Sequence, residues 1–200
     1  MVIIIRRATR SQIPEIVNYV MASRAKIFPG QDQAVIPDLA RFQETYIEHP
    51  DGCFLTAHGE DGQIVAAIGY LAYDPRFPQL DLGHERVVEV VRLYVNPSWR
   101  RAGLASRLFA ELMRHAHEAG IGRLYLHTHP HLPGAIRFWE RQGFAILDVQ
   151  ETTRWGSVVH MSRLSSPSPS ASLAVDFVPN AGIPKPNGSF AVNHQQIKGF

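Results

Sequence analysis

The sequence has very little cysteine, little net charge and no long apolar run. Among its 200 residues Cys53 is the single cysteine, so no disulfide can form within the chain. The formal net charge of +2 is too small to indicate a nucleic-acid-binding surface. No apolar run approaches the ~20 residues of a membrane-spanning helix. These absences argue against a disulfide-stabilised, a nucleic-acid-binding and a membrane-spanning protein.

The composition is that of an ordinary globular domain, with 45% hydrophobic and 19% charged residues. The apolar run in Met1–Arg7 is short and its charges follow it, unlike a secretory signal, so we expect a cytoplasmic protein. From Ser165 the sequence becomes rich in serine and proline. We therefore predict a folded domain over 1–164 and a tail over 165–200 that is disordered or forms an extended arm.

Hydrophobic periodicity and turn residues predict a mixture of strands and helices. The expected strands cover 2–6, 54–58, 64–73, 87–95, 123–128, 144–149 and 158–164. Gly69 within the third of these is expected to mark a bulge. The first helix begins after an N-cap at Ser11, with Thr9 as the alternative, and Asp38 caps the second. A third helix ends at Gly120, and a short fourth covers 134–142.

The stretch Val87–His115 organises the chain. A β-branched strand ends in a turn, and a small, cationic loop then opens a helix. A helix N-terminus carries unpaired N–H groups and a positive dipole end, which suits a polyanion. Gly103 and Ala105 allow close approach to the backbone, while Arg100 and Arg101 add positive charge. The stretch therefore predicts a polyanion-binding site.

Two segments and their order resemble a known family. They are Arg100-Arg101-Ala102-Gly103-Leu104-Ala105, which follows the strand ending in Val95-Asn96-Pro97, and Ala135-Ile136-Arg137-Phe138-Trp139-Glu140-Arg141-Gln142-Gly143-Phe144. Together they resemble the GNAT superfamily of acyl-CoA N-acyltransferases, over roughly 3–164. The resemblance implies an α/β (α+β) fold with a mixed, mostly antiparallel central sheet of about six to seven strands. Helices would flank this sheet, and its central parallel strands, 87–95 and 123–128, would splay apart.

The resemblance also implies acetyl-CoA as cofactor, an amine as acceptor and an N-acetyltransferase reaction by direct attack in a ternary complex. The acceptor would be a small molecule or a protein, and a homodimer is compatible with the family. The implied cofactor-binding residues are Leu93, Tyr94, Val95, Arg100, Arg101, Ala102, Gly103, Leu104, Ala105, Ser106 and Phe138. The backbone of Leu93 and Val95 would bind the pantetheine arm and polarise the thioester carbonyl. The alternative is a non-catalytic acetyl-CoA-binding regulatory module.

Glu89 is a carboxylate in an otherwise apolar strand. Counting by twos places it on one face with Val91, Leu93 and Val95. There it can act as general base toward an ammonium, directly or through a water, and the family often has a glutamate on this strand. The structural alternative is a charge that reaches solvent or pairs with Arg86 or Arg92.

Trp139 stands where many family members have a tyrosine that protonates the leaving thiolate. An indole N–H cannot serve as a general acid, so we expect Trp139 to be a packing residue. Either the thiolate leaves unaided or another group helps it. The candidates by position are Tyr125, His127 and His129. We select Glu89 and His127 as the catalytic pair.

A metal site is a further hypothesis for the run His127-Thr128-His129-Pro130-His131, because histidine is a common metal ligand. Pro130 breaks the strand and no carboxylate or cysteine is close in sequence, so we predict no metal. His127 or His129 is instead expected to line the acceptor pocket, with a plain surface histidine as the alternative. The loop 74–81 and the side chains of Phe28, Pro29 and Tyr46 would border that pocket. Cys53 is expected to be buried.

Overall fold

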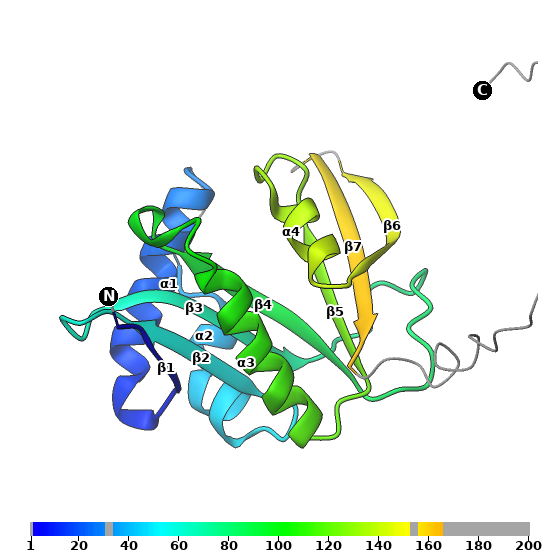
Figure 1. Ribbon diagram of the computed structural model, residues 1–200. Helices are drawn as coiled ribbons and strands as arrows, with labels where there is room; N and C mark the ends of the chain where they lie inside the picture. The colour runs from blue at the N-terminus through cyan, green and yellow to red at the C-terminus, as the bar shows by residue number, and fades with distance from the viewer. Residues whose placement is uncertain (1, 31–33, 153–155, 166–200) are drawn as a thin grey trace, which may run out of the picture. The chain divides into compact units, whose positions relative to one another are not determined.

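The computed structural model describes residues 2–30, 34–152 and 156–165, and its centre is a seven-stranded sheet (Figure 1). The strand order is β1-β2-β3-β4-β5-β7-β6. Every neighbouring pair is antiparallel except β4 and β5. The strands are β1 (Ile4–Arg7), β2 (Cys53–His58), β3 (Ile64–Ala72), β4 (Val87–Val95), β5 (Arg123–Thr128), β6 (Ala145–Thr152) and β7 (Gly156–Leu164). This confirms the mixed, mostly antiparallel sheet expected from the sequence.

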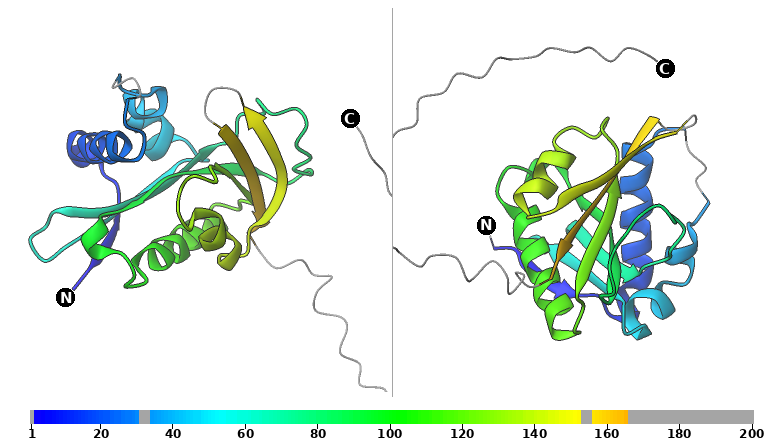
Figure 2. Two further views of the ribbon diagram at one scale, coloured as in Figure 1. Left: turned by 90° about the horizontal axis from the view of Figure 1, so that it is seen from above. Right: turned by 90° about the vertical axis from the view of Figure 1, so that its right-hand side faces the viewer.

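Helices cover both faces of the sheet (Figures 1 and 2). The α-helices are α1 (Ile13–Ile27), α2 (Pro37–Ala40), α3 (Leu104–Glu118) and α4 (Ala135–Arg141). Two 3₁₀ turns, η1 (Arg10–Gln12) and η3 (Pro97–Trp99), and a π-helical turn, η2 (Gln43–Glu48), complete the set. Apolar residues of α1, α2 and η2 form one core with β2, β3 and β4, which we call the α1 core. Those of α3 and α4 form the other core on the opposite face, which we call the α3 core. Alternate strand residues supply the two cores, as period-two burial requires.

Two predicted helix caps are wrong. Ser11 is not the cap, because it lies inside η1 and α1 begins only at Ile13. The alternative, Thr9, is the N-cap of η1, and its N–H donates to the Gln12 side-chain oxygen, 3.2 Å away. Helix α2 starts before Asp38, whose carboxylate instead binds Arg92 of β4 through two hydrogen bonds of 2.6 and 3.0 Å. A charged partner far along the chain outweighs the local capping preference of aspartate.

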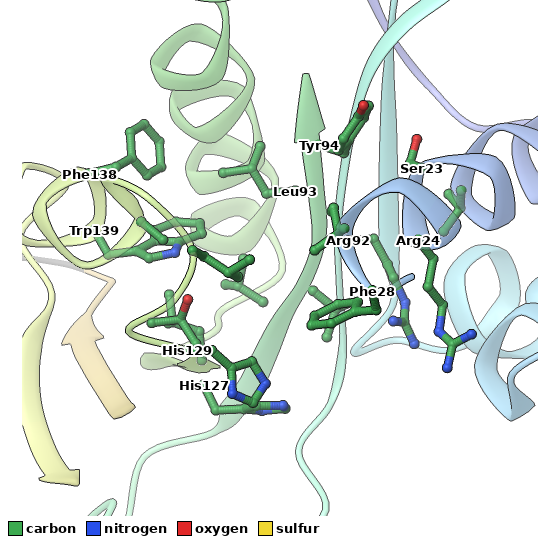
Figure 3. A pocket seen from close by; sticks show the side chains of 18 of the residues that line it. Ser23, Arg24, Phe28, Arg92, Leu93, Tyr94, His127, His129, Phe138 and Trp139 are labelled. Carbon is green, nitrogen blue, oxygen red and sulfur yellow. The ribbon is translucent and has the colours of Figure 1, made fainter. Parts of the chain in front are cut away.

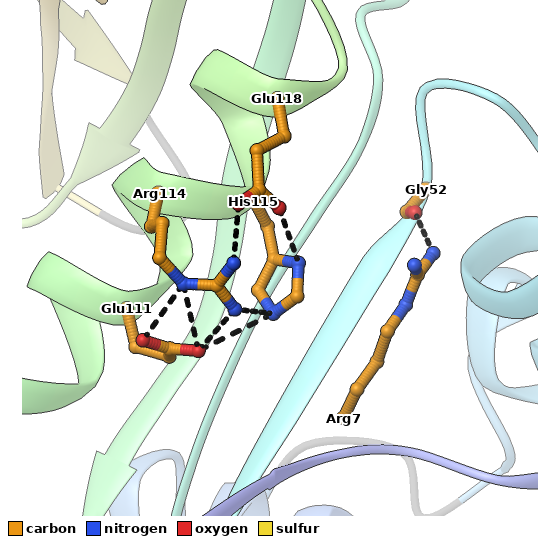
Figure 4. Close-up of polar contacts among 6 residues, drawn as sticks. All are labelled: Arg7, Gly52, Glu111, Arg114, His115 and Glu118. Atoms are coloured by element: carbon orange, nitrogen blue, oxygen red, sulfur yellow. Dashed lines mark hydrogen bonds and ion pairs between the residues drawn. The ribbon is translucent and has the colours of Figure 1, made fainter.

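Exposed ion pairs lie on the solvent face of α3 (Figure 4). Arg114 binds Glu111, three residues before it, at 2.6 Å, and also Glu118, four residues after it. Such surface pairs contribute little to the stability of a helix, because solvent and salt screen them. The opposite face of α3, with Leu108 and Leu112 fully buried, therefore provides most of the energy that fixes this helix on the sheet.

A bulge interrupts β4 at Arg92. Ala67 of β3 pairs with Tyr94, and Gly69 pairs with Val91, so Ile68 faces both Arg92 and Leu93. Arg92 takes a left-handed φ of 61°, the kind of local conformation found at bulges. The expected irregularity at Gly69 is confirmed. A Cβ at that glycine would lie 2.6 Å from the Phe54 ring, which explains why only hydrogen fits there.

The bulge exchanges the two faces of β4. Before it, Val88 and Val90 contact the α3 core, and Val91 contacts the α1 core. After it, Leu93 and Val95 contact the α3 core, while the Tyr94 ring meets Tyr19 of α1 at 6.1 Å. The prediction that Glu89 shares a face with Leu93 and Val95 is therefore wrong, because it assumed an unbroken two-residue alternation.

The parallel pairing of β4 with β5 is short. Its register runs from Val87 with Arg123 to Glu89 with Tyr125, while β5 continues to pair with β7 through Thr128. Beyond that point the two strands diverge, as Figure 1 shows. The splayed parallel pair expected from the sequence is thus present, and it opens directly after Glu89.

The predicted tail, 165–200, lies outside the described residues apart from Ser165. Within the described ranges, no helix combines the length and apolarity that crossing a membrane needs.

Candidate active site

A pocket of about 290 Å³ lies where β4 and β5 diverge (Figure 3). Side chains from α1, β4, β5, the following loop and α4 line it. Its lining residues are Tyr19, Val20, Ser23, Arg24, Ile27, Phe28, Val90, Val91, Arg92, Leu93, Tyr94, Leu126, His127, Thr128, His129, Leu132, Ala135, Phe138 and Trp139. The pocket is therefore built from the two strands that the sequence selected and the helices on either side of them.

Glu89 and His127 meet beside this pocket. The His127 Nδ1 lies 2.9 Å from Glu89 Oε1, and the His127 side chain is 35% exposed and lines the pocket. Glu89 is only 2% exposed. The structure thus brings together the two residues chosen as catalytic, with the imidazole toward the pocket and the carboxylate buried behind it.

Arg76 is a third member of this cluster, which we call the Glu89 cluster. Its Nη2 donates to the same Glu89 oxygen at 2.8 Å. Burial alone would raise the pKa of Glu89, but hydrogen bonds from His127 and Arg76 outweigh it and lower the pKa below its ordinary value. Glu89 is therefore held as a carboxylate and is a poor proton acceptor.

The loop between β3 and β4 contacts the Glu89 cluster, but none of residues 74–81, which were expected to border the pocket, lines it. Arg76 is one contact, and the neighbouring Phe77 ring meets the His127 ring at 6.3 Å. Sequence reasoning named this loop but did not assign Arg76 to Glu89. A cationic residue in a long loop next to a strand with a lone glutamate was the only signal.

Tyr125 and His129 occupy different positions. Tyr125 is fully buried, its hydroxyl lies 2.7 Å from His160 Nδ1, and it is absent from the pocket lining. Burial raises the pKa of Tyr125 well above its ordinary value, which makes it unsuited to proton transfer. His129 does line the pocket, and its Nδ1 lies 3.3 Å from the Ser157 carbonyl.

Trp139 is a packing residue for the most part. It is 7% exposed and its ring contacts those of Phe109, Phe138 and Phe144, at centroid distances of 4.9–5.6 Å. Phe138 and one part of Trp139 border the pocket. The indole is fixed by an aromatic cluster, which agrees with the role expected for it.

Only some of the other residues predicted to border the pocket do so. Phe28 lines the pocket, but Pro29 does not. Tyr46 is buried in the α1 core, where its hydroxyl donates to Asp38 at 2.5 Å. Cys53 is buried as expected, and burial raises the pKa of its thiol to about 11. Within the described ranges, no group of three or more His, Cys, Asp and Glu side chains is arranged to hold a metal ion.

Residues 100–106 run from the end of η3 into the first turn of α3. Gly103 has φ 74° and precedes the first helical residue, Leu104, and Arg101 also has a left-handed φ, of 65°. A Cβ built on Gly103 meets nothing within 4 Å, and the first turn of α3 contains no acidic residue. The helix N-terminus is therefore open and favourable to an anion.

Arg100 has a contact that the sequence did not indicate. Its Nε donates to the Val95 carbonyl at 2.9 Å, and its guanidinium lies over the Tyr94 ring, 5.5 Å from the centroid. Arg100 therefore binds the end of β4 directly. One lone pair of the Val95 carbonyl is already used, which leaves the second for any further donor.

The comparisons with known proteins agree with this arrangement. A sequence model described as "Acetyltransferase (GNAT) family" matches residues 17–144, more than half of the chain. The chain belongs to the GNAT family. Acetyl-CoA is the cosubstrate of this family. Its pyrophosphate is an anion of the kind that residues 100–106 are expected to bind.

A curated GNAT relative is the mycothiol acetyltransferase of Nocardiopsis dassonvillei. It is 31% identical over 131 residues, a match that covers 64% of this chain and 39% of the relative. The matches to this and two further curated relatives span 39–61% of their lengths.

Solved structures share the GNAT fold. One is an acetyltransferase of the GNAT family from Staphylococcus aureus, with a TM-score of 0.66, 20% identity, and coverage of 82% of this chain and all of that one. Another is an acetyltransferase from Salmonella typhimurium with its cofactor acetyl-CoA, with a TM-score of 0.64, 16% identity, and coverage of 90% and 99%. At these identities the likeness concerns the fold alone.

Proposed function

We propose that this GNAT domain transfers the acetyl group of acetyl-CoA to a primary amine by direct attack in a ternary complex. The observation that carries the proposal is the contact between Glu89 and His127 at the point where β4 and β5 part. We assign the catalytic domain to residues 1–164.

The chain's own residues fit the cofactor. The N–H groups of Gly103, Leu104, Ala105 and Ser106, with Arg101 and Ala102 beside them, form the cradle for its pyrophosphate. When bound, acetyl-CoA supplies the acetyl group as an activated thioester. The backbone of Leu93, Tyr94 and Val95 offers hydrogen bonds to its amide-bearing arm, and Phe138 offers an apolar contact.

We divide the catalytic work between His127 and Glu89. Glu89 is buried, ionised and bonded to His127 Nδ1, so it orients the imidazole ring. The other ring nitrogen, Nε2, is then the one available to an amine. The acceptor enters as an ammonium, whose nitrogen loses two protons in all. His127 accepts one of them as the C–N bond forms and the C–S bond breaks, and solvent takes the other. Overall, one proton ends on the sulfur and one in solvent, and protonated His127 can supply the former.

Substitution of these residues tests the assignment. We expect His127→Gln to lower kcat/KM about 10²- to 10⁴-fold, the usual contribution of general acid–base catalysis. Glu89→Gln keeps the shape but removes the charge that orients the ring, so we expect a smaller loss. His117→Gln is the matched control, because His117 is exposed on α3 and does not line the pocket.

The readouts are thiol release from acetyl-CoA with a panel of amines, and acetyl-CoA binding by calorimetry. All three variants should bind acetyl-CoA like the wild type. Unchanged turnover in His127→Gln would contradict the assignment of the base, and absence of transfer to every amine despite binding would contradict the proposed reaction.

Trp139 favours a second candidate, a regulatory module that binds acetyl-CoA without turnover. Its indole replaces the hydroxyl that many members of the family use as general acid. Tight acetyl-CoA binding, no transfer and recovery of a partner protein dependent on acetyl-CoA would support this candidate over the enzyme.

A further inference from the structure

We propose that Arg76 is a positioning residue of the reaction, which neutralises Glu89 and so sets the pH range in which His127 can accept a proton. This inference rests on the proposed function, because it concerns how His127 performs the role assigned to it there. It starts from the Glu89 cluster, in which one carboxylate oxygen has two donors.

The first observation is that the two donors share this oxygen. Arg76 Nη2 lies 2.8 Å and His127 Nδ1 lies 2.9 Å from Glu89 Oε1. The guanidinium and the imidazole are therefore within two hydrogen-bond lengths of each other. Glu89 is 2% exposed, so water screens its contacts less than it screens a surface pair. The Arg76 side chain is 37% exposed, so solvent weakens its effect without removing it.

The charges of Glu89 and Arg76 act on the ring in opposite directions. A buried carboxylate stabilises an imidazolium beside it, and a protonated ring has no lone pair on Nε2 to accept a proton. A guanidinium on the same carboxylate offsets this effect, because a positive charge disfavours a second cation nearby. Glu89 can therefore orient the His127 ring without also holding it protonated.

The titratable rings around His127 favour their neutral forms. The His129 and His160 rings lie 6.3 and 6.5 Å from the His127 ring, and burial lowers the pKa of both. Tyr125 pairs with Glu89 across the β4–β5 ladder, and the Tyr73 ring meets that of Tyr125 at 5.1 Å. Burial raises the pKa of both phenols. Near neutral pH these rings therefore add no charge that could replace that of Arg76.

The remaining charged or titratable groups on the surrounding elements are those of Arg24, Arg92, His131, Asp74 and Asp148. In Figure 3 the Phe28 ring lies between His127 and the two arginines. His131 stacks on the His129 ring at 5.1 Å, and Asp148 accepts from Gln79 at 3.4 Å. Asp74 lies 4.0 Å from Arg76 but is 69% exposed, so solvent screens this pair. Within the described ranges, none of the five hydrogen-bonds to Glu89 or His127.

The loop that carries Arg76 has further anchors. The Phe77 ring meets the His160 ring at 4.6 Å and the His127 ring at 6.3 Å. The contact of Gln79 with β6 holds the loop a second time. Arg76→Gln should therefore remove one positive charge while the loop stays in place, which separates the effect of the charge from that of the fold.

The test is the pH dependence of acetyl transfer to one fixed amine, whose own titration is common to all variants. We expect Arg76→Gln to move the acidic limb of the kcat/KM profile to higher pH by about 1 unit, because the carboxylate is then uncompensated. Glu89→Gln should move the limb to lower pH, and the double variant should return it towards the wild-type position. Arg76→Lys keeps the charge and should leave the limb near that of the wild type. The same shifts should appear when the His127 ring is titrated by NMR, which needs no acceptor.

Arg86→Gln is the matched control. Arg86 belongs to the same loop and pairs with Asp51 at 2.6 Å through a side chain that is 41% exposed, but it does not contact Glu89. Its loss should leave the acidic limb unchanged. An unmoved limb in Arg76→Gln, or a double variant that does not return, would overturn the inference and leave His127 as the base. Full turnover in His127→Gln would instead remove that assignment, and the inference with it.

Discussion

The β4 bulge allows a test in which glycine should be better tolerated than alanine. Arg92 has a left-handed φ of 61°, and its side chain binds Asp38 at 2.6 and 3.0 Å. Arg92→Ala removes the ion pair but keeps the unfavourable backbone angle. Arg92→Gly removes both, because glycine adopts positive φ without a steric penalty.

The magnitudes follow from these two contributions. Loss of a hydrogen bond to a charged group costs about 1.5–3 kcal/mol, and both variants share this loss. A non-glycine residue in the left-handed region costs about 1–2 kcal/mol, which only Arg92→Gly recovers. At an ordinary strand position glycine is instead less stable than alanine by about 0.5–1 kcal/mol. We therefore expect Arg92→Gly to exceed Arg92→Ala in the free energy of unfolding by about 1 kcal/mol.

Urea denaturation with matched m-values measures this difference. Val90→Ala and Val90→Gly form the control pair, because Val90 lies in the same strand before the bulge, pairs with Tyr70 and has an ordinary φ. There we expect the usual order, with alanine more stable. If Arg92→Gly proves no more stable than Arg92→Ala, the bulge is not strained at this residue and the reasoning is refuted.

Three further predictions concern stability and cofactor binding. The folded-state pKa of Glu89 is lowered, so its stabilisation is complete above the ordinary value of 4.5 and is lost as the pH falls through the folded value. Glu89→Gln should therefore flatten acid denaturation followed by circular dichroism. Gly69→Ala should destabilise the protein by about 1–3 kcal/mol in urea, because the new Cβ meets the Phe54 ring at 2.6 Å. Gly103→Ala, at φ 74° with open space around it, should cost only about 1–2 kcal/mol of stability while weakening acetyl-CoA binding measured by calorimetry.

The strands that form the site could be predicted from the sequence to the residue. Val87–Val95 and Arg123–Thr128 have the predicted bounds, because β-branched runs closed by turn residues define both. The loop 100–106 and α3 also follow from local signals, a left-handed glycine before an amphipathic helix. These features depend on neighbours in the chain, which a sequence displays directly.

The contacts that complete the site could not be predicted in the same way. Arg76 reaches Glu89 from a long loop, and Asp38 reaches Arg92 across 54 residues. Both pairs depend on strand register and on the bulge, and nothing within Val87–Val95 marks Arg92 as the residue that takes it. The one residue in the sequence that indicated an irregularity, Gly69, lies on the partner strand β3. Face assignments beyond the bulge failed for this reason, while those before it held.

The short pairing of β4 with β5 means that the sheet has a seam through its middle. Three residue pairs, from Val87–Arg123 to Glu89–Tyr125, join the two halves along this line. A molecule that binds in the opening and contacts both strands links the two halves of the sheet. Its binding free energy then adds to the free energy of unfolding. At a concentration 100-fold above its Kd it would add about 2.7 kcal/mol to the stability of the fold. The level of such a molecule around the protein would then decide both how fast it works and how long it stays folded.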